Sequence, residues 1–249
     1  MLLGTGTWAE GGGERKALVA RLASGRLADL NRIEAIRLQK LGEGEAGRLA
    51  EVLVPPSLRR VLEGGPRALA RVRQAVAYAE KWDRRGTLPA DLAPAPEAVS
   101  LGPCLPQPSR LRCLDGPSLD RQRVQGNGSV LPVPPQPTLA VLGQAGGGVA
   151  GICLALEGVG GAVLGSWMLD AWPEGDLELR AGGVRRTVAT RTWEGLDLPL
   201  LKAGEVLLLP PPRIKTLPSL PAGGDLRVRA GFDTLHLRYD PEGLHPTVQ

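Results

Sequence analysis

A proline-rich stretch between Arg84 and Pro108 separates two parts of the chain that differ in hydrophobic period. Before it, apolar residues recur at helical intervals, and after it they alternate with polar residues. Each proline removes a backbone donor and disfavours helix in the residue before it, so the stretch predicts a connector. The sequence therefore predicts an α+β protein with two domains. A small N-terminal domain with helices covers residues 1–95, and a larger, mainly-β domain covers residues 96–249.

The helical patterns lie before the connector. The segment LADLNRIEAIRLQKL, residues 27–41, has apolar residues at helix-like intervals, and Asp29 and Asn31 are both candidate N-caps, which leaves its start open. Two further helices are predicted in LRRVLEGG and RALARVRQAVAYAEKW. Gly64 and Gly65 would end the first, and Pro66 suits the first position of the second.

Short apolar runs bounded by turns follow the connector, in keeping with 34 glycines and 23 prolines in the chain. DLELR, DLRVRA and TLHLRY alternate with the period of half-buried strands, and TLAVLG, GICLAL and AVLGSWML are apolar throughout. Residues 149–169 are also long enough for a transmembrane helix. Gly151, Gly158, Gly161, Gly165 and the charged Glu157 favour two strands there instead. We expect no membrane segment.

Composition and charge exclude several classes of protein. The net charge is +4, but the excess of basic residues lies in the first 92 residues, where arginines are interleaved with acids, and aromatic residues make up only 3% of the chain. This favours a solvated surface over a nucleic-acid-binding stripe. Cys104, Cys113 and Cys153 are too few and too irregularly spaced for a disulfide framework or a zinc knuckle. The N-terminal residues lack a signal-peptide pattern, so a cytoplasmic location is expected.

The order of segments resembles the fumarylacetoacetate hydrolase superfamily over nearly the whole chain. The resemblance rests on LVPPSLRRVLEGG, ALARVRQAVAYAEK, LGPCLPQPSRLRCL, LGSWMLDAWPEGDLELRAGG, LKAGEVLLLPPP and LPAGGDLRVRAGFDTLHLRY. It implies a mixed β roll for the larger domain and a homodimer. It also implies cleavage, hydration or decarboxylation of 2-oxo and 1,3-dicarbonyl acids around Mg²⁺ or Ca²⁺, which takes several oxygen ligands.

The resemblance carries only part of the family's site onto this chain. The metal-binding acids fall on Asp115 and Glu157. The family's histidine falls on Gln122, whose amide cannot act as a base, and its Glu-x-Glu pair falls on Gln136 and Thr138. The substrate loop Thr-Gly-Thr-Pro falls on residues 209–212, which read LPPP. We therefore predict no catalytic residue and no cofactor.

Two functional hypotheses follow. In the first, the protein is a degenerate member of the superfamily without metal-dependent catalysis, with a structural or ligand-binding role. In the second, Asp115 and Glu157, with Glu178 or Asp170, rebuild a reduced Mg²⁺ or Ca²⁺ site for the family's chemistry. Beside these two stands a binding module of another kind, including one for a small anionic ligand at the arginine-rich N-terminal helices. The two histidines lie near the C-terminus, where a structural role is expected for His236 and His245.

Overall fold

The computed structural model describes residues 1–114, 124–125, 136–158, 161–181, 183–193, 195–210, 225–240 and 243–247. Of these, only the backbone is described at 124–125, 136, 157–158, 161, 181, 225, 237–240 and 243–247. The helices are α1 (Leu30–Lys40), α2 (Ala46–Leu53) and α3 (Leu58–Arg84). The strands are β1 (Leu2–Glu10), β2 (Gly13–Arg21), β3 (Leu27–Asp29), β4 (Ser100–Leu101), β5 (Arg110–Cys113), β6 (Val124–Gln125), β7 (Gln136–Gly143), β8 (Val149–Gly158), β9 (Gly161–Leu169), β10 (Asp176–Ala181), β11 (Val184–Ala189), β12 (Glu205–Leu208), β13 (Asp225–Ala230), β14 (Asp233–Asp240) and β15 (Gly243–Thr247).

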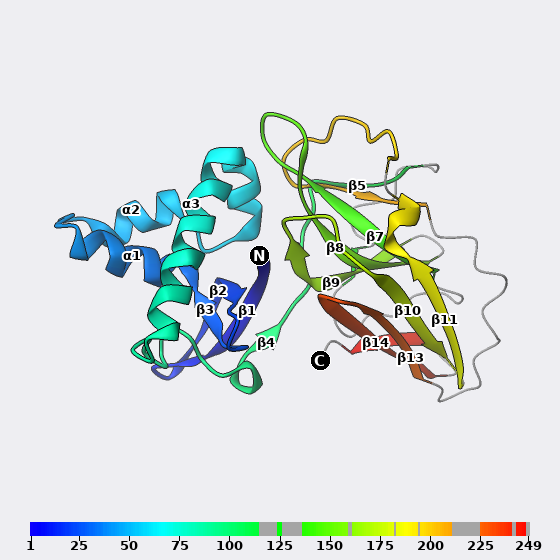
Figure 1. Ribbon diagram of the computed structural model, residues 1–249, viewed down its shortest axis with the longest axis horizontal. Coiled ribbons are helices and arrows are strands. Elements are labelled where there is room, and N and C mark those ends of the chain that lie inside the picture. Colours follow the sequence, from blue (N-terminus) through cyan, green and yellow to red (C-terminus); the bar gives the residue numbers. More distant parts are fainter. Residues whose placement is uncertain are drawn as a thin grey trace.

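The fold is built on two sheets with few helices (Figure 1). The larger sheet has the order β3-β2-β1-β9-β8-β7-β12-β5, with β4 added beside β1 and β6 beside β9. It is mixed, because β12 runs parallel to β5 and β6 parallel to β9 while the other pairs are antiparallel. The smaller sheet has the order β11-β10-β13-β14-β15. Both sheets confirm the prediction of strands beyond the connector.

Alternation along β7 divides the core into two layers. Ala140 and Leu142 belong to a cluster that also contains Leu62 and Val72 of α3, whereas Leu139 and Val141 belong to the cluster that packs against the smaller sheet. Successive residues of a strand point to opposite faces, so the large sheet is covered by helices on one side and by strands on the other. Its central strands are therefore apolar throughout rather than alternating.

Residues 149–169 form a hairpin of two strands. β8 and β9 pair antiparallel from Ile152 opposite Leu169 to Gly158 opposite Gly161. The transmembrane alternative for this stretch is thus wrong, and Gly158 ends β8 while Gly161 begins β9. Within the part of the chain that the structure describes, no helix is long and apolar enough to cross a membrane.

Helix α1 begins directly after Asp29, which settles the start that the sequence left open. The Asp29 carboxylate accepts a bond from the backbone N–H of Arg32 (3.2 Å) and is fully buried. Burial raises the pKa of this carboxyl, while bonds from the Arg15 guanidinium (2.6 Å to Nε) oppose the shift. The cap and the ion pair together fix the junction between β3 and α1.

The two helices expected between residues 58 and 84 are joined as α3, with one break. Gly65 has φ 65° and ψ −153°, outside the helical region, and Pro66 follows it. A Cβ at Gly65 would lie 2.8 Å from the carbonyl oxygen of Ala145. The neighbouring amide of Ala145 donates to the Leu62 carbonyl (2.8 Å). The kink therefore docks α3 onto the loop between β7 and β8.

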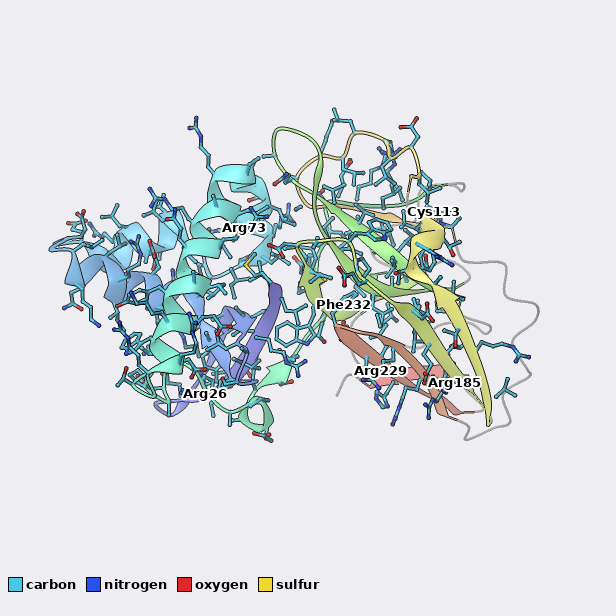
Figure 2. All side chains as sticks on the ribbon, in the orientation of Figure 1. Arg26, Arg73, Cys113, Arg185, Arg229 and Phe232 are labelled. Atoms are coloured by element: carbon cyan, nitrogen blue, oxygen red, sulfur yellow. The ribbon has the colours of Figure 1, made fainter. Side chains whose placement is uncertain are left out.

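An arginine secures the segment that follows α3. Arg26, labelled in Figure 2, donates to the carbonyl oxygens of Ala93 (2.9 Å) and Leu88 (3.1 Å) and forms an ion pair with Asp83 (2.9 Å). The planar guanidinium can bond to all three residues at once because its N–H donors point in different, fixed directions. Residues 88–93 are thereby held against β3 and the end of α3.

The domain boundary near residue 95 stays a prediction. β1 pairs with β9, with Leu2 opposite Leu169 and Leu3 opposite Met168, so the large sheet continues from the first residues into the second half of the chain. One buried cluster likewise contains residues of α1 and α3 together with residues of β7, β8 and β12. The two parts share a sheet and a core.

Candidate active site

Four strand ends meet at one end of the large sheet. β5 and β12 are parallel and end together, with Leu208 opposite Cys113. β12 is antiparallel to β7, and β7 to β8, so β7 begins and β8 ends at the same place. The register sets the backbone of Gln136 opposite that of Glu157. We call this region the β7–β8 end.

The β7–β8 end holds those positions of the sequence-derived site that the structure describes. Gln136, Thr138 and Glu157 lie there, although the structure describes only the backbone of Gln136 and Glu157. Asp115 and Gln122 lie outside the described residues. The assignment of Asp115 and Glu157 as metal ligands therefore stays a prediction.

Thr138 takes the place of a carboxylate and is committed to a structural bond. Its side chain is fully buried, and its hydroxyl donates to the carbonyl oxygen of Leu209 at 2.6 Å. Across the sheet its partner is Ala155, whose partner in turn is Leu164, and both are fully buried. This row of the sheet thus offers one hydroxyl oxygen, which a backbone carbonyl already engages.

The backbone that leads from β12 into residues 209–212 is held on both sides. Leu209 donates its N–H to the carbonyl of Leu139 (2.9 Å), which extends the pairing of β7 and β12 by one residue. The indole Nε1 of Trp193 donates to the carbonyl of Pro210 (2.7 Å), and the Trp193 side chain is buried. No local sequence pattern points to this role of Trp193, because its partner lies 17 residues further along the chain.

Asp170, one of the two further acids considered for a reduced site, lies far from this end. It follows β9 directly, whereas Ala162 at the start of β9 pairs with Glu157, which separates the two acids by roughly 25 Å along the strand at about 3.3 Å per residue. Burial opposes its ionisation, but bonds from the Met1 amine (2.8 Å) and from Arg73 (3.0 Å) hold the pKa of Asp170 below its usual value. Asp170 cannot share an ion with Glu157.

The remaining candidates belong to the smaller sheet. Glu178 on β10 forms ion pairs with Arg180 and Arg185, and the bond from Arg180 lowers the pKa of its carboxyl. His236 is half-buried on β14, opposite Arg227 of β13, and the side chain of His245 lies outside the described residues. Among the described side chains, no group of three His, Cys, Asp or Glu residues could hold a metal ion.

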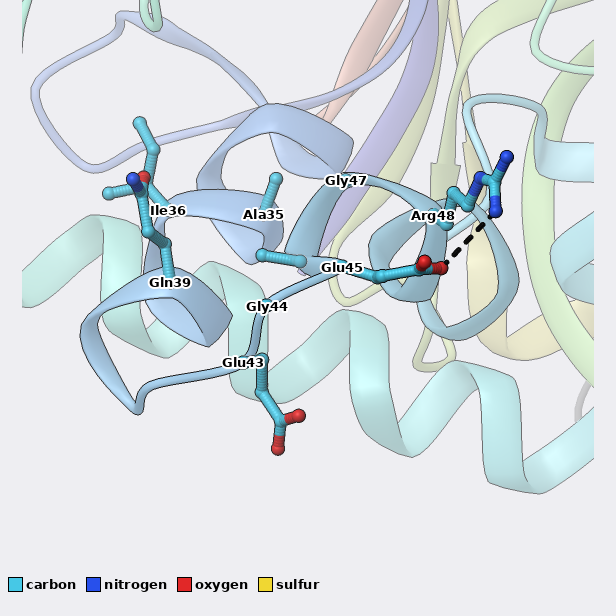
Figure 3. Close-up of a pocket in the computed structure, with 9 residues that line it drawn as sticks. Ala35, Ile36, Gln39, Glu43, Gly44, Glu45, Gly47 and Arg48 are labelled. Atoms are coloured by element: carbon cyan, nitrogen blue, oxygen red, sulfur yellow. Dashed lines mark hydrogen bonds and ion pairs between the residues drawn. The ribbon is translucent and has the colours of Figure 1, made fainter.

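A hollow of about 490 Å³ lies where α1 meets α2 (Figure 3). Its polar groups are exposed, and Glu45 forms an ion pair there with Arg48 (3.3 Å). An exposed pair of this kind contributes little binding energy. The hollow therefore offers no group that is set up for chemistry.

No protein-family model matches the chain, and no curated protein matches it. Solved structures do. Maleylpyruvate hydrolase from Sphingobium sp. SYK-6 is 13% identical, with a TM-score of 0.58 over 100% of this chain and 98% of that one. A probable 2-hydroxyhepta-2,4-diene-1,7-dioate isomerase from Mycobacterium abscessus is 14% identical, with a TM-score of 0.53 over 96% and 98%. A 2-keto-3-deoxy-D-arabinonate dehydratase complexed with magnesium and 2,5-dioxopentanoate is 10% identical, with a TM-score of 0.50 over 100% and 98%.

These enzymes are members of the fumarylacetoacetate hydrolase superfamily, and the chain has their fold. The similarity to maleylpyruvate hydrolase covers 100% of this chain and 98% of that one, so it is not confined to one sheet. The resemblance deduced from the sequence is confirmed at the level of the fold.

Proposed function

We propose that this protein keeps the fumarylacetoacetate hydrolase fold without its metal-dependent catalysis and acts through a structural or ligand-binding role. The observation that carries the proposal is Thr138, which is fully buried at the β7–β8 end with its hydroxyl bonded to the Leu209 carbonyl. The hydroxyl is neutral, so Thr138 brings no negative charge to a cation, and its only proton is engaged by the Leu209 carbonyl. The described residues do not fit a hard cation.

The chemistry of the substitutions supports the same conclusion. Mg²⁺ and Ca²⁺ bind through several oxygen ligands, and carboxylates supply most of the attraction. With Gln136 and Thr138 at the Glu-x-Glu positions, two negative charges are missing from the set that the resemblance implies. Gln122 in place of the histidine also removes the proton acceptor, since an amide does not titrate near neutral pH. The chain therefore lacks both the paired metal-binding carboxylates and the proton acceptor that the resemblance implies.

The alternative is a reduced metal site built on Asp115 and Glu157. Two of the similar structures favour it, because maleylpyruvate hydrolase has been solved with manganese(II) and pyruvate and the dehydratase with magnesium and 2,5-dioxopentanoate. Under this alternative the protein would be a hydrolase, hydratase or decarboxylase of 2-oxo or 1,3-dicarbonyl acids. Two carboxylates and the Gln136 amide would then have to hold the ion.

Metal titration separates the two functions. We expect millimolar MgCl₂, MnCl₂ or CaCl₂ to leave the melting temperature of the metal-free protein unchanged, because a ligand stabilises only the folded state that binds it. The matched control is Glu157→Gln, which removes a predicted ligand and keeps the size of the side chain. A melting temperature that rises with Mn²⁺ in the wild type and not in the variant, together with turnover of an acylpyruvate, would establish the alternative.

The proposal includes the organisation that the resemblance implies: an N-terminal domain (1–95), a mixed β roll (96–249), a cytoplasmic location and a homodimer. Pairing of the β rolls is the part that a solution measurement decides. Light scattering on the purified chain of 26.2 kDa should give about twice that mass, independent of protein concentration over a tenfold range. A monomer mass at all concentrations would contradict it.

A further inference from the structure

A second pocket lies between β1, β2 and the start of α3, away from the β7–β8 end. It has a volume of about 340 Å³, near the lower limit for small-molecule sites. We call it the β1–α3 pocket. Its lining includes Thr5 of β1 and the solvent-exposed Lys16 of β2, which we call its floor, together with Ser57, Leu58, Leu105 and Pro106.

The floor of the β1–α3 pocket carries polar groups that face in the same direction. In the antiparallel register Thr5 is opposite Leu18 and Thr7 is opposite Lys16, so Thr5 and Lys16 lie on one face of the sheet as diagonal neighbours. Such neighbours are about 7 Å apart, a distance that one small ligand can bridge. The register alone thus sets a hydroxyl beside an ammonium group.

The Thr5 hydroxyl has no partner among the described residues, although only 7% of the Thr5 surface is exposed. Its oxygen is not among the buried unpaired side-chain atoms, so it is open to the pocket and can bond to a molecule that enters there. Ser57 repeats the pattern. It occupies the N-cap position of α3 but its side chain makes no capping bond. Both hydroxyls are available to a ligand.

The charge around the pocket is positive. Its lining includes the cations Lys16 and Arg59 and contains no acid. Arg59 is engaged by Glu63 (3.0 Å) and donates to the Gln107 carbonyl (3.3 Å), which ties the pocket rim to α3. Among the described residues no carboxylate forms an ion pair with Lys16. One uncompensated cation and two hydroxyl donors match a single negative charge.

We propose that the β1–α3 pocket binds a small organic monocarboxylate. Its carboxylate would accept from Lys16 and the hydroxyls of Thr5 and Ser57, and its short hydrocarbon part would contact Leu58 and Leu105. The apolar wall favours a carboxylic acid over inorganic phosphate, which would find one cation where it requires several donors. The site would supply the ligand-binding role in the proposed function, but it depends neither on the presence nor on the absence of a metal.

Calorimetric titration with sodium butyrate in the presence of EDTA tests the proposal. We expect saturable binding at millimolar butyrate, at least tenfold weaker binding of 1-butanol, which lacks the charge, and weaker binding of inorganic phosphate. Lys16→Met should weaken butyrate binding by about tenfold, because a charge-assisted hydrogen bond is lost while the length of the side chain is kept. Thr5→Val should weaken it several-fold.

Lys81→Met is the matched control, because it removes the same charge from an exposed position near the end of α3, outside the pocket lining. It should bind butyrate like the wild type. The proposal is overturned if Lys16→Met and Lys81→Met bind butyrate equally, or if the wild type shows no saturable binding. Thermal melts of each variant separate lost binding from lost folding. EDTA removes metal ions, so failure here leaves the metal titration and the proposed function unaffected.

Discussion

Replacing Thr138 with glutamate should lower the free energy of unfolding by about 4 kcal/mol at neutral pH, because it places an unpaired carboxylate at a fully buried position. The new side chain would also face the Leu209 carbonyl, which now accepts a bond from Thr138 at 2.6 Å. Two acceptors would then meet without a donor. Urea unfolding followed by the fluorescence of the five tryptophans measures the effect.

Thr138→Val is the matched control for this substitution. It keeps the branched shape and removes the hydroxyl, so it should cost only about 1 kcal/mol for one buried hydrogen bond. Adding Mg²⁺ or Mn²⁺ to the Thr138→Glu variant distinguishes the two functional hypotheses. Recovery of wild-type stability would mean that the β7–β8 end still holds an ion once one acid returns, contrary to the degenerate site. We expect no recovery.

Stability should also fall as pH rises between about 4 and 7, owing to Asp233 at the start of β14. Its carboxylate is buried against the large sheet, where it accepts from the backbone N–H groups of Thr234 (2.8 Å) and Trp167 (3.3 Å). Desolvation outweighs these bonds and raises the pKa of Asp233 from 3.8 to about 6. The folded protein therefore retains a proton that the unfolded chain releases earlier.

The sign and size of this effect follow from proton binding. Between the two pKa values the folded state binds more protons, so the free energy of unfolding decreases with pH, by about 3 kcal/mol for a shift of about two units. Asp233→Asn has no such proton to lose. The difference in stability between wild type and variant should therefore move by about 3 kcal/mol in favour of the variant from about pH 4 to about pH 7.

Asp176→Asn removes the same charge from an exposed position on β10 and reports what the charge change alone does. Two neighbouring groups interact with Asp233: the charge of Arg21 lowers the pKa of Asp233, and the charge of Asp233 adds to the hydrogen bond with Cys104 and to burial in raising the pKa of the Cys153 thiol. A stability difference between wild type and Asp233→Asn that stays constant with pH would show that Asp233 is ionised throughout.

Asp233 fits against the large sheet because residue 165 is glycine. A Cβ at Gly165 would collide with the Asp233 carboxylate and would lie 3.1 Å from the Leu154 carbonyl oxygen. Phe232, beside it in the chain, contacts both the cluster between the sheets and the cluster around Trp8 (Figure 2). The turn between β13 and β14 thus joins the smaller sheet to the N-terminal strands.

The sequence predicted those elements whose signal is local. The alternation in residues 176–180, 225–230 and 234–239 and the apolar runs of residues 138–143, 151–156 and 162–169 lie in strands, and the stripe through Leu69 and Val72 is the buried face of α3. Helix α2 was missed, because among its residues only Ala50 is buried and its apolar pattern is short. The hairpin of β1 and β2 was not found from periodicity, because glycine and threonine dilute its alternation.

The sequence shows which residues replace the family's acids, but it does not show which bonds the replacing residues make. Gln136 and Thr138 are visible in the sequence, and the resemblance shows what they replace. The bond from Thr138 to Leu209 spans 71 residues of sequence, so no local pattern predicts that the Thr138 hydroxyl bonds to the backbone carbonyl of Leu209. The β1–α3 pocket was missed for the same reason, because β1, β2 and α3 reach it from separate parts of the chain. Such contacts form between residues that are far apart in the sequence, and only the pairing of the strands brings them together.

The pairing of β1 with β9 also bears on how the chain can fold during synthesis. Strand β4 can pair with Gly6 and Thr7 of β1 once residue 101 has been made, but Leu2 and Leu3 of β1 find their partners on β9 only when Met168 and Leu169 have been made. Contacts between such distant segments close slowly, because a long loop must be ordered before they form. In the nascent protein, this part of the β1 edge is therefore without its β9 partner until then, and a chaperone or a neighbouring chain could pair with it.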